Sequence, residues 1–201
     1  MDVYEQTLHE AGFALVAGAD EAGRGACAGP LVAAAVILGQ TAPDGLDDSK
    51  RLTPTRRAKL YDAILAQAVA VAWVRVEAAD CDRLGMQRAD LDGLCQAIEE
   101  LDPAPDFAIT DGFAVPGLTC PSVAMWKGDQ VVQCVSAASI IAKVTRDRIM
   151  DELAVRYPGY GFEVHKGYVT GDHQRALDRL GPCPEHRLSY RNVSQPTVPS
   201  I

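Results

Sequence analysis

The sequence is poor in aromatic residues, has no excess of positive charge and contains no long apolar run. Aromatic side chains make up 6% of the 201 residues, which argues against an extended base-stacking platform for single strands. Acidic residues outnumber basic ones by 27 to 19, so the net charge of -8 excludes coating of nucleic acid by bulk charge, but not a local basic face. The longest strongly apolar run, Leu31 to Leu38, is far shorter than the roughly 20 residues of a membrane helix.

Cysteine patterns of disulfide scaffolds and of zinc sites are also missing. The cysteines are scattered, without a C-x-x-C pair or a histidine at zinc spacing. We therefore expect reduced, mostly buried cysteines. The first five residues are acidic in character and begin no apolar segment of the secretory type. These features predict a cytoplasmic protein that does not bind membranes.

Apolar runs and turn residues predict an α/β protein. Strands are expected at 13–19, 31–38, 69–76, 107–110 and 123–126. Helices are expected at 80–101, 131–157 and 170–180, and one that Thr53 and Pro54 open runs to about residue 68. Two strands in succession, followed by helices alternating with single strands, indicate a mixed sheet flanked by helices. We expect one domain over residues 1–192 and a flexible tail over 193–201, in which no clamp-binding motif is visible.

Acidic residues follow three of these strands. Asp20 and Glu21 end the first strand, Asp111 ends the fourth, and Asp129 follows the fifth. Functional groups of open α/β sheets gather beyond strand ends, and carboxylates that converge there repel one another unless a cation holds them. Oxygen ligands without histidine or cysteine favour Mg²⁺ or Mn²⁺. The alternative is that these acids are caps and solvated turns.

A turn with three glycines, at positions 23, 25 and 29, lies beside the acidic pair. Its spacing differs from the dinucleotide-binding fingerprint, and Pro30 opens a strand where that motif needs a helix. Glycines allow a ligand to approach the backbone closely, so we favour a binding loop that includes Gly23, Arg24 and Gly25 over a merely mobile one.

Basic residues are clustered. Residues 50–59 carry five of them and no acid, while Lys143 and Arg146 are spaced to share one face of the long predicted helix. Such a run is usually a solvated face. Beside a carboxylate metal site, however, Lys50, Lys143 and Arg146 are candidates to contact the phosphates of a nucleic acid, with an affinity that falls as salt rises.

Six motifs in order resemble the bacterial ribonuclease HII family, the type 2 ribonucleases H, and the resemblance runs from about residue 13 to residue 192. They are GADEAGRG at 18–25, DSKRL at 48–52, DG at 111–112, KGD at 127–129, SAASIIAKV at 136–144 and HKGY at 165–168. The resemblance implies a ribonuclease H-like fold with a small helical C-terminal part. It also implies an endonuclease that cleaves RNA in RNA–DNA hybrids and single ribonucleotides embedded in duplex DNA.

The resemblance further implies roles for individual residues. Asp20, Glu21, Asp111 and Asp129 match the family's metal-binding carboxylates. Residues 23–25 match the loop that reads the 2′-hydroxyl, and Tyr168 matches the tyrosine that packs on the next deoxyribose. Two Mg²⁺ or Mn²⁺ ions would support a cut on the 5′ side of the ribonucleotide, leaving a 3′-hydroxyl and a 5′-phosphate. Histidines are not needed for this chemistry, so structural roles are expected for His165 and His186.

Three other functions fit parts of this pattern. Ribonuclease HIII shares the fold, but it normally carries an additional N-terminal domain and lacks the arginine between the loop glycines. A hybrid-binding protein without catalysis would not need four intact carboxylates. A magnesium-dependent phosphatase for small molecules would act on mononucleotides and not on duplexes. We expect the chain to act as a monomer on RNA–DNA hybrids and on DNA with embedded ribonucleotides.

Overall fold

Five strands form one mixed sheet in the order β3-β2-β1-β4-β5. The structure is a computed structural model that describes residues 2–46, 49 and 52–194. Strands β1, β2 and β3 are antiparallel neighbours, whereas β4 runs parallel to β1 and β5 parallel to β4. The strands are β1 (Val16–Ala22), β2 (Leu31–Ile37), β3 (Ala70–Val76), β4 (Phe107–Asp111) and β5 (Ser122–Met125). The predicted α/β class and mixed sheet are confirmed.

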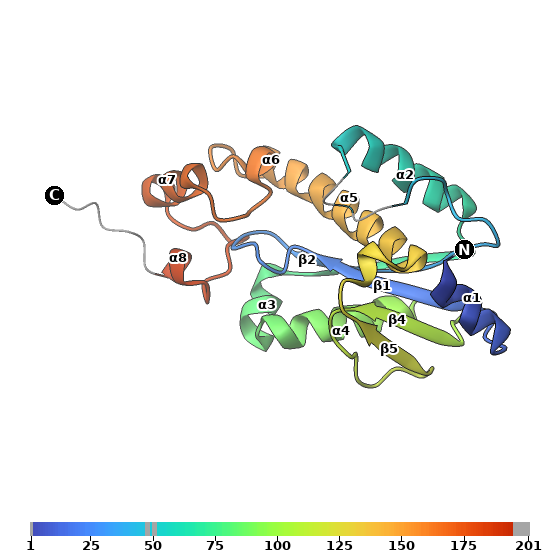
Figure 1. Cartoon of the computed structure of the whole chain (residues 1–201). Helices are drawn as coiled ribbons and strands as arrows, with labels where there is room; N and C mark the ends of the chain where they lie inside the picture. Colours follow the sequence, from blue (N-terminus) through green and yellow to red (C-terminus); the bar gives the residue numbers. More distant parts are fainter. Residues whose placement is uncertain (1, 47–48, 50–51, 195–201) are drawn as a thin grey trace.

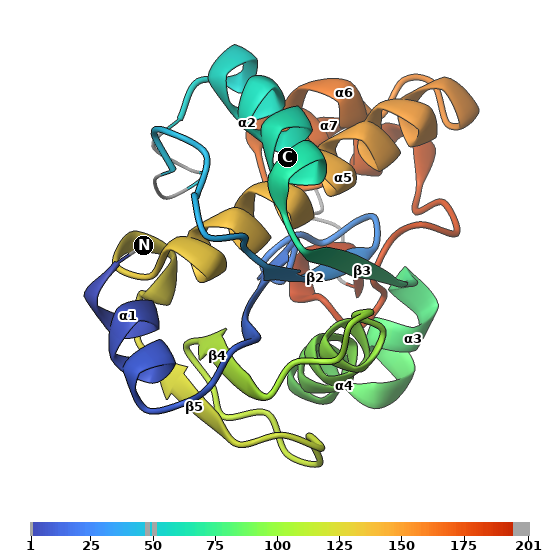
Figure 2. The ribbon, with the colours of Figure 1, turned by 90° about the vertical axis from the view of Figure 1, so that its right-hand side faces the viewer.

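Helices cover both faces of the sheet (Figures 1 and 2). On one face lie α2 (Pro54–Gln67) and α5 (Gln133–Arg156), and on the other lies α4 (Met86–Glu99) with α3 (Ala78–Leu84) beside it. Successive side chains of a strand point to opposite faces. The buried residues of β2 accordingly divide between two clusters: Val32, Ala34 and Val36 pack on the α5 side, and Ala33, Ala35 and Ile37 pack on the α4 side.

Helix α5 approaches β1 unusually closely at Gly18. A Cβ atom on Gly18 would lie 2.2 Å from the backbone carbon of Cys134 and from the backbone nitrogen of Val135. No side chain fits in that space, so glycine is required there. The close contact brings the first turn of α5, and the turn before it, next to the end of β1.

Two predicted elements differ from the structure. The first strand begins and ends three residues later than expected, because Asp20, Glu21 and Ala22 still pair with β2. The single helix expected over residues 80–101 is two helices, α3 and α4, separated by Gly85 at φ 81°. A left-handed residue interrupts the helical backbone, and glycine adopts that conformation without strain.

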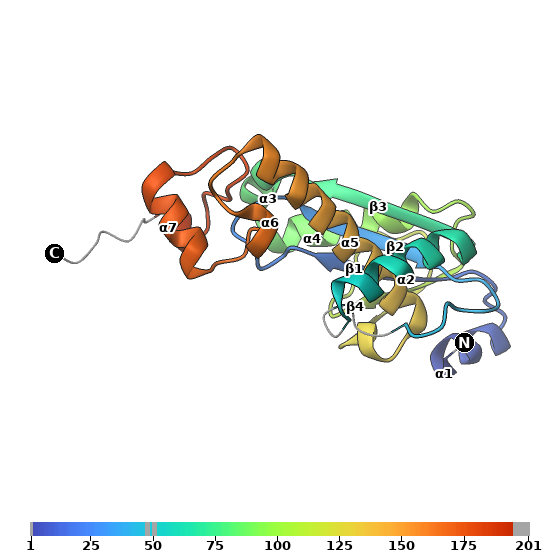
Figure 3. The same ribbon diagram turned by 90° about the horizontal axis from the view of Figure 1, so that it is seen from above.

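The C-terminal part and the N-terminal helix lie at opposite ends of the molecule (Figure 3). The former contains α6 (Phe162–His165), α7 (Gly171–Leu180) and α8 (Arg191–Ser194), and the latter is α1 (Val3–Glu10). Within the expected tail, Val193 is buried against Cys27 and Leu177, and residues 195–201 fall outside the described part. No helix among the described residues has the length and apolar character needed to cross a membrane.

Candidate active site

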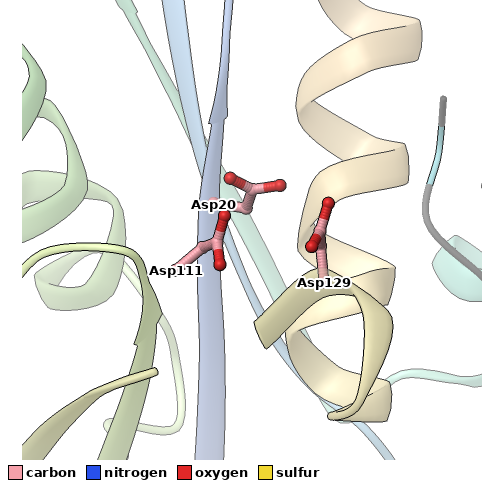
Figure 4. A group of neighbouring side chains, drawn as sticks. All are labelled: Asp20, Asp111 and Asp129. Carbon is pink, nitrogen blue, oxygen red and sulfur yellow. The ribbon is translucent and has the colours of Figure 1, made fainter. Parts of the chain in front are cut away.

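Three of the four predicted carboxylates meet at one edge of the sheet. Asp20 lies near the end of β1, Asp111 is the last residue of β4, and Asp129 lies in the short helix η1 (Gly128–Gln130) that follows β5. One oxygen of each lies within 4.8 Å of the other two, and Figure 4 shows the three side chains gathered around a common space. Because β1, β4 and β5 are parallel, their carboxyl ends share this edge, and groups far apart in the sequence converge there.

Backbone N–H groups hold two of these carboxylates in place. The amide of Glu21 donates to Asp20 Oδ1 at 2.7 Å, and the amide of Gly128 donates to Asp111 Oδ1 at 2.7 Å. Asp20 is 4% exposed; its burial, followed by repulsion from Glu21 and Asp111, raises the pKa of its carboxyl well above the usual range. Three acids gathered in this way are costly to keep ionised unless a proton or a cation compensates them.

The fourth predicted carboxylate, Glu21, lies outside this group. It directly follows Asp20 on β1, so its side chain points to the opposite face of the sheet, toward α4. Its pKa is raised to about 7, first by burial and then by repulsion from Asp90 of α4. Glu21 nevertheless lines two hollows beside the three aspartates, so it stays a candidate for contact with a metal ion or a substrate.

Asp90 is a site residue that the sequence did not reveal. It is 1% exposed, and its Oδ2 atom lies 3.2 Å from Nη1 of Arg24. The other oxygen, Oδ1, is buried without a hydrogen-bond partner among the described residues. The Arg24 guanidinium also lies over the ring of Phe113, at 4.6 Å from its centre. Arg24 is therefore held between α4 and the end of β4, and no local signal around Asp90 indicated this role.

Two buried arginines donate hydrogen bonds to backbone carbonyl groups of the glycine loop. Arg146 donates to the carbonyl oxygens of Pro30, Lys166 and Ala28, at 2.9, 2.9 and 3.0 Å. Arg187, which the sequence did not point to, donates to those of Gly23 and Gly29 at 2.8 and 2.9 Å. The two guanidiniums hold the carbonyl groups of a loop that is neither helix nor strand.

The expectation that Arg146 contacts phosphate is wrong, because its side chain is fully buried. The Arg146 side chain packs closely against Gly23. Gly23 has φ 97°, and a Cβ atom on it would lie 2.0 Å from Nε of Arg146. Burial lowers the pKa of the guanidinium only to about 10, so it stays charged near neutral pH. Arg146 holds the loop and does not face the substrate.

The remaining predicted substrate residues line one hollow of about 210 Å³, here named the Tyr168 hollow. Tyr168 is 38% exposed at its rim, and Lys143 reaches it from α5 while forming an ion pair with Asp147 at 2.6 Å. Lys50 lies outside the described residues, so its predicted contact stays a prediction. The lining residues are Glu21, Ala22, Gly23, Arg24, Gly25, Ser49, Ser139, Lys143 and Tyr168.

Comparison with known proteins agrees with this geometry. The family model described as ribonuclease HII matches residues 17–193. This chain belongs to the ribonuclease HII family. It is 57% identical to the ribonuclease HII of Cutibacterium acnes, over 94% of this chain and 95% of that protein. It is 54% identical to the ribonuclease HII of Salinispora arenicola, over 94% of this chain and 72% of that protein.

Solved structures of the family share the fold. The ribonuclease H2 of Pyrococcus horikoshii superposes with a TM-score of 0.78 at 28% identity, covering 90% of this chain and 96% of that one. A ribonuclease HII of Archaeoglobus fulgidus, solved in complex with PCNA, gives 0.77 at 25%, covering 89% and 96%. A ribonuclease HIII solved with Mn²⁺ gives 0.64 at 22%, covering 92% and 70%, a likeness of fold alone. The family assignment thus favours ribonuclease HII over the rival HIII.

His173 and His186 of this family member form a chain of hydrogen bonds, here named the histidine relay. Nδ1 of His186 accepts from the amide of Cys183 at 3.0 Å, Nε2 of His186 lies 3.1 Å from Nε2 of His173, and Nδ1 of His173 lies 3.0 Å from the carbonyl of Tyr168. One set of neutral tautomers satisfies all three contacts: His186 donates to His173, and His173 donates to Tyr168. The relay ties the C-terminal part to the residue at the rim of the Tyr168 hollow.

Acid is expected to weaken this relay. Burial lowers the pKa of His173, and burial together with His173 lowers the pKa of His186 to about 4. A depressed pKa means that the neutral form favours folding, so this stability is present above the usual pKa of 6.5 and is lost as pH falls toward 4. We expect the melting temperature of the wild type, relative to that of His186→Gln, to fall over this window. Thermal unfolding in EDTA at a series of pH values measures it.

The control for this prediction is His9→Gln. His9 lies in α1, at the other end of the molecule, and contacts the carbonyl of Phe13. Its replacement should leave the pH profile unchanged. A difference in melting temperature between the wild type and His186→Gln that is the same at pH 6.5 and at pH 4 would contradict the assignment of neutral histidines.

Proposed function

We propose that this chain is an endoribonuclease that hydrolyses the RNA strand of RNA–DNA hybrids, including single ribonucleotides embedded in duplex DNA. It would cut on the 5′ side of the ribonucleotide and leave a 3′-hydroxyl and a 5′-phosphate. The observation that carries the proposal is the group of Asp20, Asp111 and Asp129 within 4.8 Å, directly beside the glycine loop and Tyr168. Membership of the ribonuclease HII family supports the choice of substrate.

The three aspartates fit a divalent cation. Their donor atoms are all carboxylate oxygens, which suit Mg²⁺ or Mn²⁺ better than zinc. Burial and repulsion from Glu21 and Asp111 raise the pKa of Asp20, and a bound cation would relieve that repulsion. We propose that Asp20, Asp111 and Asp129 hold such ions, with Glu21 contributing from the adjacent hollows. Two bound ions would supply an activated water and stabilisation of the leaving 3′-oxygen.

The protein's own residues would select and orient the substrate. A 2′-hydroxyl is the group that distinguishes RNA from DNA at a given sugar, and the backbone of residues 23–25 is open to it because glycine carries no side chain. Arg24 is restrained by Asp90 and Phe113, and the loop carbonyls are restrained by Arg146 and Arg187. These contacts keep the loop in one geometry, so little ordering remains to be done on binding. Lys143 would lie near the sugar-phosphate backbone of the strand that carries the ribonucleotide.

We further propose that the chain acts as a monomer. We also propose a cytoplasmic location, since the substrate of this reaction is cellular nucleic acid. The direct test is a labelled DNA duplex with one embedded ribonucleotide, incubated with and without Mg²⁺. We expect one cut, on the 5′ side of the ribonucleotide, and none in an all-DNA duplex. Binding without cleavage would favour a hybrid-binding protein. Release of phosphate from mononucleotides without duplex cleavage would favour a phosphatase.

Tyr168→Ala should reduce cleavage of a single embedded ribonucleotide more than cleavage of an all-RNA strand paired with DNA. A ring packed on the deoxyribose after the ribonucleotide selects one register, and misplacement by about 1 Å costs on the order of 100-fold in rate. An all-RNA strand lacks that deoxyribose, so the contact is already poor there. The ratio of kcat/KM for the two substrates, in wild type and variant, measures the effect. Equal losses on both substrates, with a lowered melting temperature, would mean that Tyr168 only packs.

A further inference from the structure

A second hollow includes Asp111, one of the three aspartates, in its lining. It measures about 330 Å³ and is here named the Trp126 hollow. It shares the lining residues Glu21 and Arg24 with the Tyr168 hollow, so the two are neighbours near the end of β1. The lining residues are Glu21, Arg24, Asp111, Gly112, Phe113, Trp126 and Lys127. A strand whose scissile phosphate lies at Asp111 and whose 3′ side lies against Tyr168 would have its 5′ side here.

Two aromatic side chains of the Trp126 hollow are exposed without covering any core. Trp126 is 77% exposed and Phe113 is 39% exposed, in a chain with only two tryptophans and four phenylalanines. One face of Phe113 is occupied by the Arg24 guanidinium at 4.6 Å. An exposed tryptophan is costly in water, and aromatic faces beside a cationic group are what sugars and bases of nucleic acids pack against.

Lys127 adds an uncompensated positive charge at the same place. It follows Trp126 directly, is exposed, and has no ion-pair partner among the described residues. Its backbone is left-handed, with φ 58° and ψ 41°, which turns the chain from β5 into η1. In a protein of net charge -8, an exposed lysine in a hollow that Glu21 and Asp111 also line suits a ligand that brings both phosphates and a metal ion.

We propose that Phe113, Trp126 and Lys127 form a second substrate contact, which holds the strand on the 5′ side of the scissile phosphate. The two aromatic rings pack against that part of the strand, and Lys127 pairs with one of its phosphates. The nucleic-acid strand is then bound on both sides of the scissile phosphate, by Tyr168 on the 3′ side and by this contact on the 5′ side. The inference rests on the proposed function, because it takes the position of the scissile phosphate from it.

The two tryptophans allow a test that does not depend on activity. Trp73 lies on β3 and is absent from both hollows, so Trp73→Phe leaves Trp126 as the only fluorescent indole, and Trp126→Phe leaves only Trp73. We expect a duplex with one ribonucleotide, added in EDTA so that it is not cut, to quench the emission of the Trp73→Phe protein. The emission of the Trp126→Phe protein should stay unchanged.

Shortened duplexes show which side of the ribonucleotide, 5′ or 3′, contacts Trp126. A duplex cut back to a short stub on the 5′ side of the ribonucleotide should lose the quenching, and one cut back on the 3′ side should keep it. Unchanged Trp126 emission with a duplex that binds, or quenching lost only from the 3′-shortened duplex, would overturn the proposal. A wild-type protein that binds the duplex and shows the quenching, but does not cleave in Mg²⁺, would count against the proposed function and not against this contact.

Binding measurements separate the two kinds of contact. Trp126→Ala should weaken duplex binding about tenfold, the size of one lost aromatic contact, at an unchanged salt slope. Lys127→Ala should make the salt slope shallower by about one, as for one lost phosphate contact. Trp73→Ala is the matched control and should change neither. Because Trp126 and Lys127 are exposed, equal melting temperatures would show that both variants fold, and binding equal to wild type would overturn the proposal.

Discussion

Asp20→Asn should abolish cleavage while the fold survives. Removing one of the three carboxylates that we propose to hold the catalytic ions should remove several kcal/mol of transition-state stabilisation, and about 4 kcal/mol corresponds to roughly 1000-fold in rate. The measurement is kcat/KM on a duplex with one ribonucleotide under saturating Mg²⁺. A variant that keeps more than about a tenth of the wild-type rate would show that Asp20 is not part of the catalytic site.

The same substitution should raise stability in EDTA near neutral pH. Asp20 has a raised pKa in the folded protein, so its charged form opposes folding. Wild-type stability from this group is greatest below its usual pKa of 3.8 and falls as pH rises toward the raised value. Asparagine does not ionise, so the variant does not lose this stability as pH rises. Asp92→Asn is the control, because Asp92 lies on the surface of α4 and, within the described part of the chain, forms an ion pair with Arg88 alone; it should alter neither activity nor stability appreciably.

Arg146→Met should destabilise the protein by about 3 kcal/mol or more and disable the glycine loop. Methionine fills part of the volume but donates no hydrogen bond, which leaves the carbonyls of Ala28, Pro30 and Lys166 without the donor they have now. Each buried polar group left unpaired costs about 1–3 kcal/mol. Chemical denaturation gives the loss in free energy of unfolding, and cleavage of the single-ribonucleotide duplex gives the loss in activity.

Arg148→Met is the matched control for Arg146→Met. Arg148 lies on the same helix, is exposed, and lies over the ring of Tyr61 at 4.4 Å, so its loss should cost less than about 1 kcal/mol. Arg146→Lys should also fail to restore full stability, because a lysine ammonium cannot reach three carbonyls as a planar guanidinium does. If Arg146→Met is as stable as Arg148→Met, Arg146 does not support the loop.

Much of the fold followed from short-range patterns. Thr53 caps α2 through a hydrogen bond to the amide of Arg56, with Pro54 in the first turn, as the sequence indicated. The long helix predicted over residues 131–157 is α5, and its apolar residues Ile141 and Ile149 are buried. These features depend on residues close together in the chain, so they are visible in the sequence. Gly85 was the exception, because helical periodicity continues across it.

The site was predicted from acidic residues at the ends of strands. The sequence alone did not show in which direction each of these side chains points. Asp20, Asp111 and Asp129 were expected to meet because each follows or ends a strand, and they do. Glu21 was assigned to the same group, although the two-residue period of a strand directs neighbours to opposite faces. The expected strand stopped before Asp20, so this difference in direction became visible only when β1 was seen to continue through Ala22; the role of Glu21 stays a prediction.

The sequence by itself determined the class of fold, the carboxylates at the edge of the sheet and the family to which they belong. Only the tertiary structure decided which polar side chains face the substrate and which hold the loop. Arg146 contacts carbonyls more than a hundred residues away in the chain, and so does Arg187. Asp90 pairs with Arg24 across two elements. Long charged side chains have no local signature for burial, because their environment is set by segments that meet only when the chain has folded.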